Sequence, residues 1–428
     1  MCELAGPALL AEGHGTSPTC PPMRIDRLAS ARQHAVMRRT FDASLAFLTV
    51  SALVVGCAPG AETPGPAPED VVTPPVDATI APDLAPAADA SPAPGPFDAP
   101  GQEATVVAFD GRHVFFTGAD NQRTVETTAS FPDTGSYAKI TLYLTLTCPD
   151  GGCDAWDRRG AISLVAPVPG PDGPRDVSIE LLRFITPFGV GLSASQDLTD
   201  LRPLLRGEVR LRTFIDTWVG PGSPYGAGWR VTAIFIFEGG APSRLPIAVI
   251  PLHTERAVPY GDPAQPPEAT APPITVALPE GASSAAIRAL ITGHGQGNAD
   301  NCAEFCARDH TLTVAPADVA FPAVAHTRRV WRDDCPTTAA PDQRGTWRYP
   351  RAGWCPGALV EPWTVDLPAA ALPSRTLTVA YAPEPWVNTC RPDASPCSGC
   401  VFDTGCAYND SSHTQPFHQV STLLIAYR

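Results

Sequence analysis

From Thr105 to the C-terminus, the sequence is a series of short apolar segments separated by Gly and Pro. Residues 137–148 and 209–218 alternate apolar with polar side chains, which is the pattern of a strand with one buried face. Residues 231–237 are almost continuously apolar, as expected for a strand buried on both faces. No segment of this region repeats its apolar residues with the helical period of about 3.6 residues. The pattern therefore predicts an all-β chain built from sandwiches or jelly rolls.

A Pro-rich segment at residues 259–273 interrupts the series of strands. Further strands are expected after it, at residues 274–278, 286–292, 310–314, 364–367, 377–381 and 420–427. We therefore expect two adjacent jelly-roll β-sandwich domains, one at residues 101–256 and the other at residues 257–428. Residues 383–417 are Cys-rich and are expected to form an insertion before the last strand of the second domain.

The N-terminal region contains a signal-like segment. Residues 1–36 show no apolar periodicity, and we interpret them as untranslated or disordered sequence before a true start at Met37. Two arginines and an apolar run follow Met37, and the run ends at Gly56-Cys57, which resembles a bacterial lipobox. We expect residues 37–56 to be a lipoprotein signal peptide and Cys57 to be lipidated. A plain secretory signal cleaved elsewhere is the alternative.

Residues 57–100 are rich in Pro and Ala and lack the apolar content of a core, so we expect a disordered tether. A lipid on Cys57 would be the only contact with a membrane. The expected location is outside the cytoplasm, either anchored to the bacterial outer membrane or cell surface, or secreted. The 13 cysteines favour the same conclusion, because disulfides form in oxidising compartments. The net charge of -14 argues against a nucleic-acid partner.

Two short loops pair cysteines with carboxylates. The sequence Cys148-Pro-Asp-Gly-Gly-Cys153 has the spacing of a small disulfide ring around a Gly-Gly turn, and Asp157 follows it closely. Cys302-Ala-Glu-Phe-Cys306 is a second short loop, with Glu304 inside it. Such rings can fix the position of a side chain, as a catalytic carboxylate requires.

The first of these loops, extended to Cys148-Pro-Asp-Gly-Gly-Cys-Asp-Ala-Trp-Asp-Arg158, resembles the corresponding stretch of the peptide N-glycosidase F family. The resemblance continues in order through Arg183-Phe-Ile-Thr-Pro-Phe, Asp216-Thr-Trp218, Val258-Pro-Tyr-Gly261, Gly293-His-Gly295, Cys302–Cys306 and Arg351-Ala-Gly-Trp-Cys-Pro-Gly357. It implies two adjacent jelly rolls and an amidase that cleaves the bond between the innermost GlcNAc of an N-linked glycan and asparagine. It also implies N-glycosylated proteins or glycopeptides as partners, no cofactor or metal, and a monomer.

The resemblance assigns roles to individual residues. Asp157 matches the primary catalytic carboxylate and Glu304 a second essential acid. Asp216, the third expected catalytic residue, lies where the family has a substrate-contacting glutamate; its side chain is one methylene shorter, so that contact could be lost or bridged by water. The substrate-binding positions are Trp156, Arg158, Trp218, Arg351 and Trp354. Cys335 and Cys355 match a third family disulfide that braces the segment from Arg351 to Trp354.

These residue types suit amide hydrolysis. Carboxylates can position and deprotonate water, an arginine can stabilise developing negative charge, and tryptophans offer apolar faces to sugar rings. We hypothesise that Asp157 polarises the water and the first GlcNAc, while Glu304 supports the leaving side. A non-catalytic glycan-binding lipoprotein on the same fold is the alternative function, and a surface scaffold is a third.

Two groups of residues lie outside this scheme. Cys390, Cys397, Cys400 and Cys406 can form two disulfides, with three possible connectivities, or bind zinc. His294, His310, His413 and His418 invite a metal hypothesis, but no His-x-His pair accompanies them and no methionine follows Met37. That absence argues against a copper site, and scattered histidines are more often hydrogen-bonded structural residues.

Overall fold

The computed structural model describes residues 95–168, 173–295, 302–317, 322–388 and 415–428. These residues all belong to one unit of the chain, Ala88–Arg428. The expected signal peptide, Cys57 and most of the tether lie outside the described residues. The same is true of His413 and of the four cysteines of the expected insertion.

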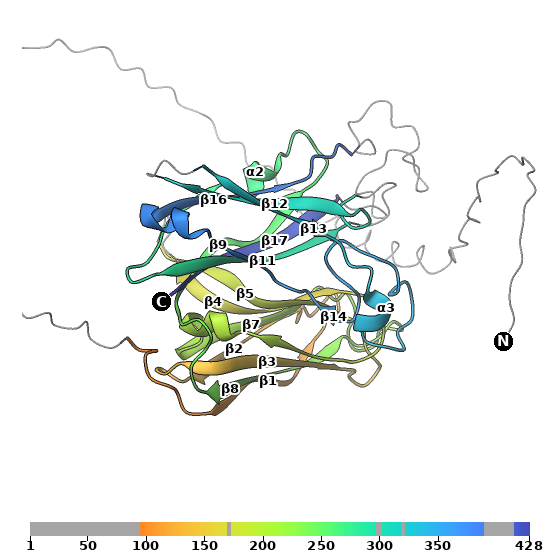
Figure 1. Ribbon diagram of the computed structural model, residues 1–428. Coiled ribbons are helices and arrows are strands. Elements are labelled where there is room, and N and C mark those ends of the chain that lie inside the picture. Colours follow the sequence, from red (N-terminus) through yellow and green to blue (C-terminus); the bar gives the residue numbers. More distant parts are fainter. Residues whose placement is uncertain (1–94, 169–172, 296–301, 318–321, 389–414) are drawn as a thin grey trace, which may run out of the picture. The chain divides into compact units, whose positions relative to one another are not determined.

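The regular secondary structure of the described residues is almost entirely strand, which confirms the all-β prediction (Figure 1). The first group comprises β1 (Ala104–Val114), β2 (Thr124–Phe131), β3 (Tyr137–Thr147), β4 (Arg159–Val168), β5 (Arg175–Ile185), β6 (Leu192–Asp197), the 3-10 helix η1 (Thr199–Leu204), β7 (Gly207–Ile215) and β8 (Trp229–Gly239). The second comprises β9 (Pro246–Pro259), α2 (Pro267–Thr270), β10 (Ile274–Ala277), β11 (Ser284–His294), β12 (Arg308–Pro316), β13 (Val324–Val330), α3 (Cys335–Thr338), β14 (Ala358–Leu359), β15 (Trp363–Asp366), η2 (Ala369–Ser374), β16 (Thr376–Pro383) and β17 (Phe417–Tyr427).

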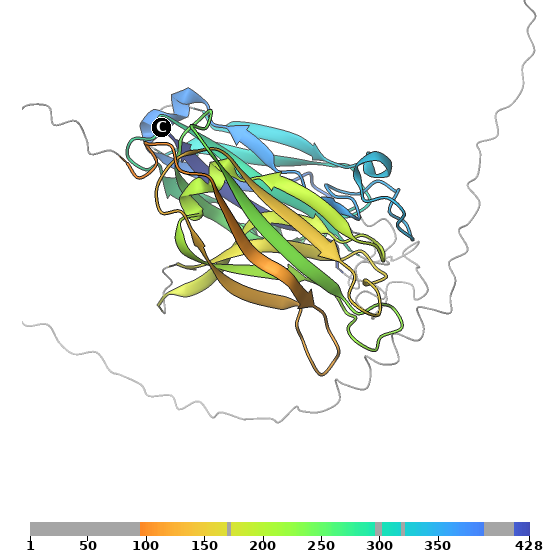
Figure 2. The same cartoon turned by 90° about the horizontal axis from the view of Figure 1, so that it is seen from below.

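The strands form four antiparallel sheets that lie in layers (Figures 1 and 2). The N-terminal sandwich pairs the sheet β1-β8-β3-β6 with the sheet β14-β5-β4-β7-β2, and the C-terminal sandwich pairs β15-β11-β17-β9 with β10-β16-β12-β13. Each sandwich encloses its own apolar core. Sandwich-like sheets are thus confirmed, while the jelly-roll connectivity stays a prediction. No helix in the described part of the chain is long and apolar enough to cross a membrane.

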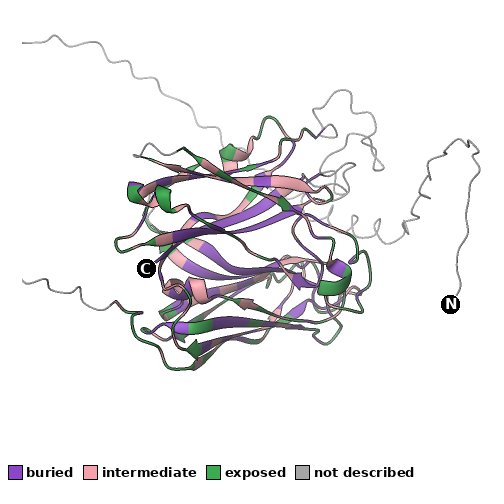
Figure 3. Cartoon of the chain, viewed as in Figure 1, coloured by how far each residue is buried: buried purple, intermediate pink, exposed green. Residues whose placement is uncertain are grey.

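Burial shows how the two sandwiches meet. Strands β5, β11 and β17 are buried along almost their whole length, which places both of their faces against other layers (Figure 3). Leu423 and Ile425 of β17 share an apolar cluster with the N-terminal sheets, so the two central sheets pack on each other. The apolar run 231–237 forms part of β8 in an outer sheet, where buried and half-buried residues alternate. The expectation that this strand is buried on both faces was therefore wrong.

Strand β9 bears on the division between the domains. It runs from Pro246 to Pro259 and pairs with β17 along its length, so it belongs to the C-terminal sandwich on both sides of the expected division at residue 257. We therefore propose that the division lies between β8 and β9. The Pro-rich segment that suggested the later position begins only at the end of this strand.

Candidate active site

Asp154 organises the loop that carries Asp157 into β4. Its carboxylate is completely buried and accepts hydrogen bonds from Thr217 Oγ1 at 2.7 Å, Arg158 Nε at 2.8 Å and the Trp156 amide at 3.0 Å. A buried carboxylate with three donors is a rigid anchor. It fixes the chain on both sides of Asp157, which is half-buried. No sequence pattern predicted a role for Asp154, because only the fold shows that its side chain points inward.

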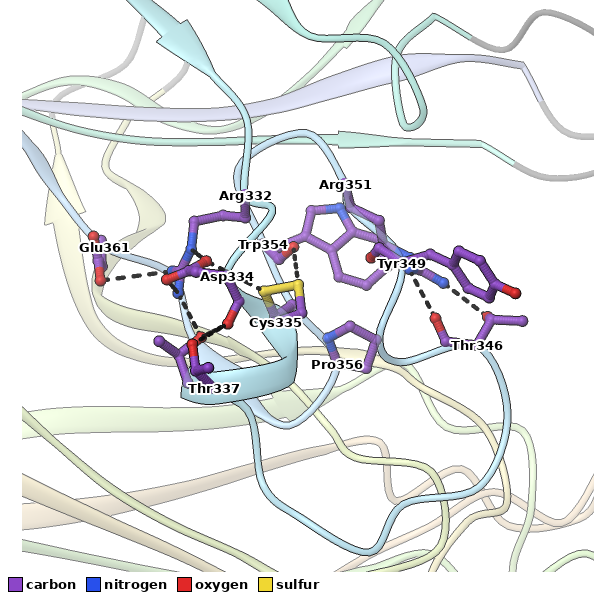
Figure 4. The surroundings of a disulfide bond; sticks show 12 residues. Arg332, Asp334, Cys335, Thr337, Thr346, Tyr349, Arg351, Trp354, Pro356 and Glu361 are labelled. Atoms are coloured by element: carbon purple, nitrogen blue, oxygen red, sulfur yellow. Dashed lines mark hydrogen bonds and ion pairs between the residues drawn. A yellow bond between two sulfur atoms is a disulfide. The ribbon is translucent and has the colours of Figure 1, made fainter. Parts of the chain in front are cut away.

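Three disulfides stand at the expected positions, Cys148–Cys153, Cys302–Cys306 and Cys335–Cys355. The first closes the ring before Asp154, and the second closes the ring that contains Glu304. The third joins α3 to the segment after Arg351 (Figure 4). Each predicted ring therefore lies directly beside a predicted site residue.

Gly293 explains how the Glu304 ring is seated on β11. A Cβ atom at this glycine would lie 1.6 Å from the Ala303 carbonyl oxygen, so only glycine permits this approach. The Ala352 carbonyl accepts a hydrogen bond from the Gly293 amide at 3.0 Å, and the Glu304 carbonyl accepts one from the Ala352 amide at 2.9 Å. The backbone at Glu304 is thus held between β11 and the segment after Arg351.

Glu304 and Arg351 lie against each other and are almost buried. Arg351 Nε lies 3.4 Å from Glu304 Oε1, and the side chains are 4% and 12% exposed, respectively. The Gly295 amide donates a hydrogen bond to Glu304 Oε2 at 3.1 Å. One carboxylate oxygen therefore faces the guanidinium and the other faces a backbone donor, which orients the group.

Arg351 is itself fixed by the loop before it (Figure 4). Its guanidinium donates to the carbonyls of Thr346 and Tyr349 at 3.1 and 2.9 Å and to Thr346 Oγ1 at 2.9 Å. The guanidinium carbon lies 5.0 Å from the centre of the Trp354 ring. Such a planar cation, held by several acceptors, keeps one geometry while its Nε points at Glu304.

Electrostatics connects Asp157 with this pair. Burial and the charge of Asp157 raise the pKa of Glu304 to about 8, although Arg351 opposes the shift. Burial also raises the pKa of Asp157, against the attraction of Arg351 and Arg158. Asp157 precedes β4 and Glu304 follows β11, so the structure brings together two acids from different sandwiches beside one arginine. Two nearby carboxylates with raised pKa values favour sharing a proton at neutral pH.

Comparisons with known proteins find similarity to one kind of enzyme. Residues 265–398 match the family model "Peptide-N-glycosidase F, C terminal". The curated protein peptide-N(4)-(N-acetyl-beta-D-glucosaminyl)asparagine amidase F of Elizabethkingia miricola is 27% identical over 283 residues, which cover 62% of this chain and 73% of that protein. The chain is related to peptide N-glycosidase F.

Solved structures show the same fold. The glycosylasparaginase PNGase F from Flavobacterium meningosepticum superposes with a TM-score of 0.58 at 23% identity, covering 76% of this chain and 96% of that one. PNGF-II superposes with a TM-score of 0.53 at 17% identity, covering 76% of this chain and 65% of that one. The two-domain β-sandwich expected from the resemblance to the peptide N-glycosidase F family is therefore present.

Trp354 does not fit the sugar-contacting role that the resemblance to peptide N-glycosidase F implied. Only 4% of the residue is exposed, and its Nε1 donates to the Gly293 carbonyl at 2.7 Å. The ring packs with Ile185, Leu290 and Val360, so it offers no face to a ligand. Trp354 instead supports Arg351 and Gly293 from the core.

Asp216 and Trp218 lie on either side of Thr217, whose hydrogen bond to Asp154 attaches this segment to the loop that carries Asp157. Trp218 is 43% exposed, as a sugar platform requires. Arg123 lies 3.3 Å from Asp216 Oδ1, and its guanidinium carbon is 4.4 Å from the centre of the Trp218 ring. Arg123 therefore occupies space beside the shortened Asp216. No sequence pattern pointed to Arg123, because it follows an ordinary polar loop with no motif.

The histidines divide into two places. His294 stacks on Trp354 at 5.6 Å and exchanges a hydrogen bond with Thr292 at 2.7 Å, behind the site. His310 and His418 lie 4.5 Å apart at one end of the C-terminal core. No group of three or more potential metal ligands occurs within the described ranges. The structure thus gives all three described members of this set aromatic packing partners, and it gives His294 and His310 a hydrogen-bonding partner each.

Proposed function

We propose that this protein is an amidase that hydrolyses the bond between the innermost GlcNAc of an N-linked glycan and asparagine. The carrying observation is the juxtaposition of Asp157, Glu304 and Arg351 at the meeting of two sandwiches. The relationship to an amidase of this kind supports the same substrate class. Trp156, which precedes Asp157 in the sequence, and Trp218, which follows the Thr217 that binds Asp154, are both exposed and supply the apolar faces that bind sugar rings.

Glu304 is suited to act as the acid. With a pKa of about 8 it holds a proton at neutral pH, and the Gly295 amide fixes the orientation of its carboxyl group. Expulsion of an amine from an amide requires a proton on the departing nitrogen. Glu304 supplies that proton to the glycosylamine.

Asp157 is suited to act as the base. The cations of Arg351 and Arg158 favour its ionised form, while burial makes that form a stronger proton acceptor than an exposed aspartate. With Asp157 ionised and Glu304 protonated, only one of the two groups is charged, so the repulsion between two carboxylates is avoided. Arg351 then stabilises the negative charge that develops as water adds to the carbonyl.

The proposed reaction balances without a cofactor. Water oxygen bonds to the asparagine side-chain carbonyl as Asp157 accepts one of its protons. The carbon–nitrogen bond then breaks, and Glu304 protonates the departing nitrogen. The products are a peptide aspartate and a glycosylamine. Transfer of the proton from Asp157 back to Glu304 restores the starting state.

The test is incubation of the purified full-length protein with an Asn-linked glycopeptide, followed by mass spectrometry of the peptide. Glycan release with conversion of asparagine to aspartate supports the amidase. The expected loss for Asp157→Asn is roughly 10²–10⁴-fold in kcat. Binding of the glycopeptide without cleavage supports the alternative, a glycan-binding protein. An unchanged rate for Asp157→Asn contradicts the assigned base.

We further propose that the protein acts outside the cytoplasm, anchored through a lipid on Cys57. The three disulfides beside the site support an oxidising compartment. Incorporation of labelled palmitate that is lost in Cys57→Ala supports the anchor. Incorporation that persists in this variant contradicts it.

A further inference from the structure

Exposed aromatic side chains gather around the proposed active site. The described residues include only five exposed Phe, Trp or Tyr side chains, namely Tyr143, Trp156, Trp218, Phe305 and Tyr349. All but Tyr143 adjoin a site residue in the sequence or through a contact. An exposed aromatic cluster beside a candidate site indicates a binding surface, since folding alone favours burial of these rings.

The N-terminal part of this surface carries polar groups beside its tryptophans. Trp218 shares Arg123 with Asp216, whose carboxylate is 43% exposed. Arg123 Nε in turn donates to Asn121 Oδ1 at 3.0 Å. An aromatic face beside accessible acceptors and donors matches a sugar, which presents C–H faces and hydroxyl groups.

The C-terminal part is different. Phe305 is 52% exposed and has no polar side-chain atom, and the neighbouring Arg351 and Glu304 are paired with each other. Tyr349 is 51% exposed, and Figure 4 shows its ring directed away from Arg351 and the disulfide. A phenyl ring and a phenol ring with a single hydroxyl match apolar side chains better than a hydroxyl-rich sugar.

Both C-terminal rings are on rigid supports. Phe305 lies inside the ring closed by Cys302–Cys306, with its centre 5.7 Å from the Arg351 guanidinium carbon. The Tyr349 carbonyl accepts from the same guanidinium at 2.9 Å. Preformed backbone positions lower the entropic cost of binding. The Phe305 ring and the Tyr349 backbone therefore both contact Arg351, so both residues are attached to the surface at fixed positions.

We propose that Phe305 and Tyr349 form the peptide-binding side of the active site and favour apolar residues next to the glycosylated asparagine. The inference rests on the proposed amidase function, because a glycopeptide has a glycan half and a peptide half that meet at the scissile amide. The tryptophan side binds the glycan. The Phe305 side then receives the polypeptide.

The test uses two glycopeptides with the same glycan, one with Leu and the other with Ser immediately before and after the glycosylated asparagine. For the full-length protein we expect kcat/KM to favour the Leu peptide by on the order of tenfold. In Phe305→Ser and Tyr349→Ser the preference should fall to within about twofold, through loss of the Leu peptide's advantage. Both side chains are exposed, so these variants should fold normally.

Two further variants separate this effect from others. Tyr143→Ser removes an aromatic ring of similar exposure from the outer sheet and should leave the preference unchanged. Trp218→Ser should slow both peptides alike. A preference that survives in both Phe305→Ser and Tyr349→Ser overturns the proposal. If the wild type cleaves neither peptide, the amidase function fails, and the ratio of the two dissociation constants in the same variants decides the peptide side on its own.

Discussion

At the residue scale, Glu304 carries the strongest prediction. Its proposed role requires a proton, and its pKa is about 8. Activity should therefore fall as the pH rises through about 8, because the acid form is lost. Glu304→Gln should lower kcat by roughly 10²–10⁴-fold and remove that alkaline decline from the residual activity. Rate profiles of both proteins between pH 5 and 10, measured on one glycopeptide, provide the check.

Stability gives Glu304 a readout that does not depend on activity. A carboxyl whose pKa is raised on folding stabilises the native state at low pH, and this contribution is lost as the pH rises through the folded value. The part of the unfolding free energy that Glu304 contributes should thus be lost between about pH 4.5 and 8, so the wild-type value minus the Glu304→Gln value should fall over this range. A difference in unfolding free energy between the two proteins that stays the same at every pH would contradict the raised pKa of Glu304.

At the scale of elements, the contact between β11 and the disulfide ring that contains Glu304 determines where Glu304 lies. Gly293→Ala places a Cβ atom 1.6 Å from the Ala303 carbonyl oxygen, so the ring must move. We expect destabilisation of about 1–3 kcal/mol and a fall in kcat of at least about tenfold, since Glu304 moves with the ring. Denaturant titration and a kinetic assay measure the two effects.

A matched substitution shows whether this effect is local. At Gly95, an added Cβ atom has no neighbour closer than 3.4 Å, so Gly95→Ala should preserve both stability and rate. If Gly293→Ala loses stability but keeps the wild-type kcat, the contact between β11 and the Glu304 ring does not position Glu304.

The sequence predicted the elements better than their surroundings. Alternation located β3, and cysteine spacing located two rings, because both depend on residues close together in the chain. The burial of Trp354 and the pairing of Arg123 with Asp216 depend on contacts across 61 and 93 residues, respectively. No local pattern encodes such contacts. The same limit explains β8, since an apolar run does not reveal whether its sheet is central or external.

At the scale of the whole molecule, a buried arginine joins the two sandwiches. Between the central sheets, Arg183 binds Glu180 and also donates to Thr292 Oγ1 and the Gln419 carbonyl, and it is fully buried. This arginine joins β5 to β11 and β17, so the orientation of the two sandwiches is specified by directional bonds as well as by apolar contact. The placement of Asp157 relative to Glu304 depends on that orientation, because Asp157 belongs to the N-terminal sandwich and Glu304 to the C-terminal one.

The C-terminal core contains the group that should govern acid stability. His310 and His418 are buried together, with Tyr381 OH at 2.8 Å from His310 Nδ1. Burial lowers the pKa of His310 to about 3 and that of His418 well below its usual value. Both rings are therefore neutral in the folded protein, whereas the unfolded chain takes up protons below about pH 6.5.

The sign of the effect follows from this difference. A group whose pKa is lowered on folding contributes stability above its unfolded pKa, and this is lost as the pH falls toward the folded value. The contribution of the two histidines to the free energy of unfolding should therefore decrease from about pH 6.5 to about pH 3, by up to about 1.4 kcal/mol per pH unit for each histidine. His418→Phe keeps an aromatic ring in the core and removes one titrating group, so it should flatten this slope. His326→Phe makes the same change on the edge strand β13 and should leave the slope as in the wild type. Urea titrations of the full-length proteins at each pH measure the slope, and equal slopes for the wild type and His418→Phe would show that the acid sensitivity arises elsewhere in the molecule.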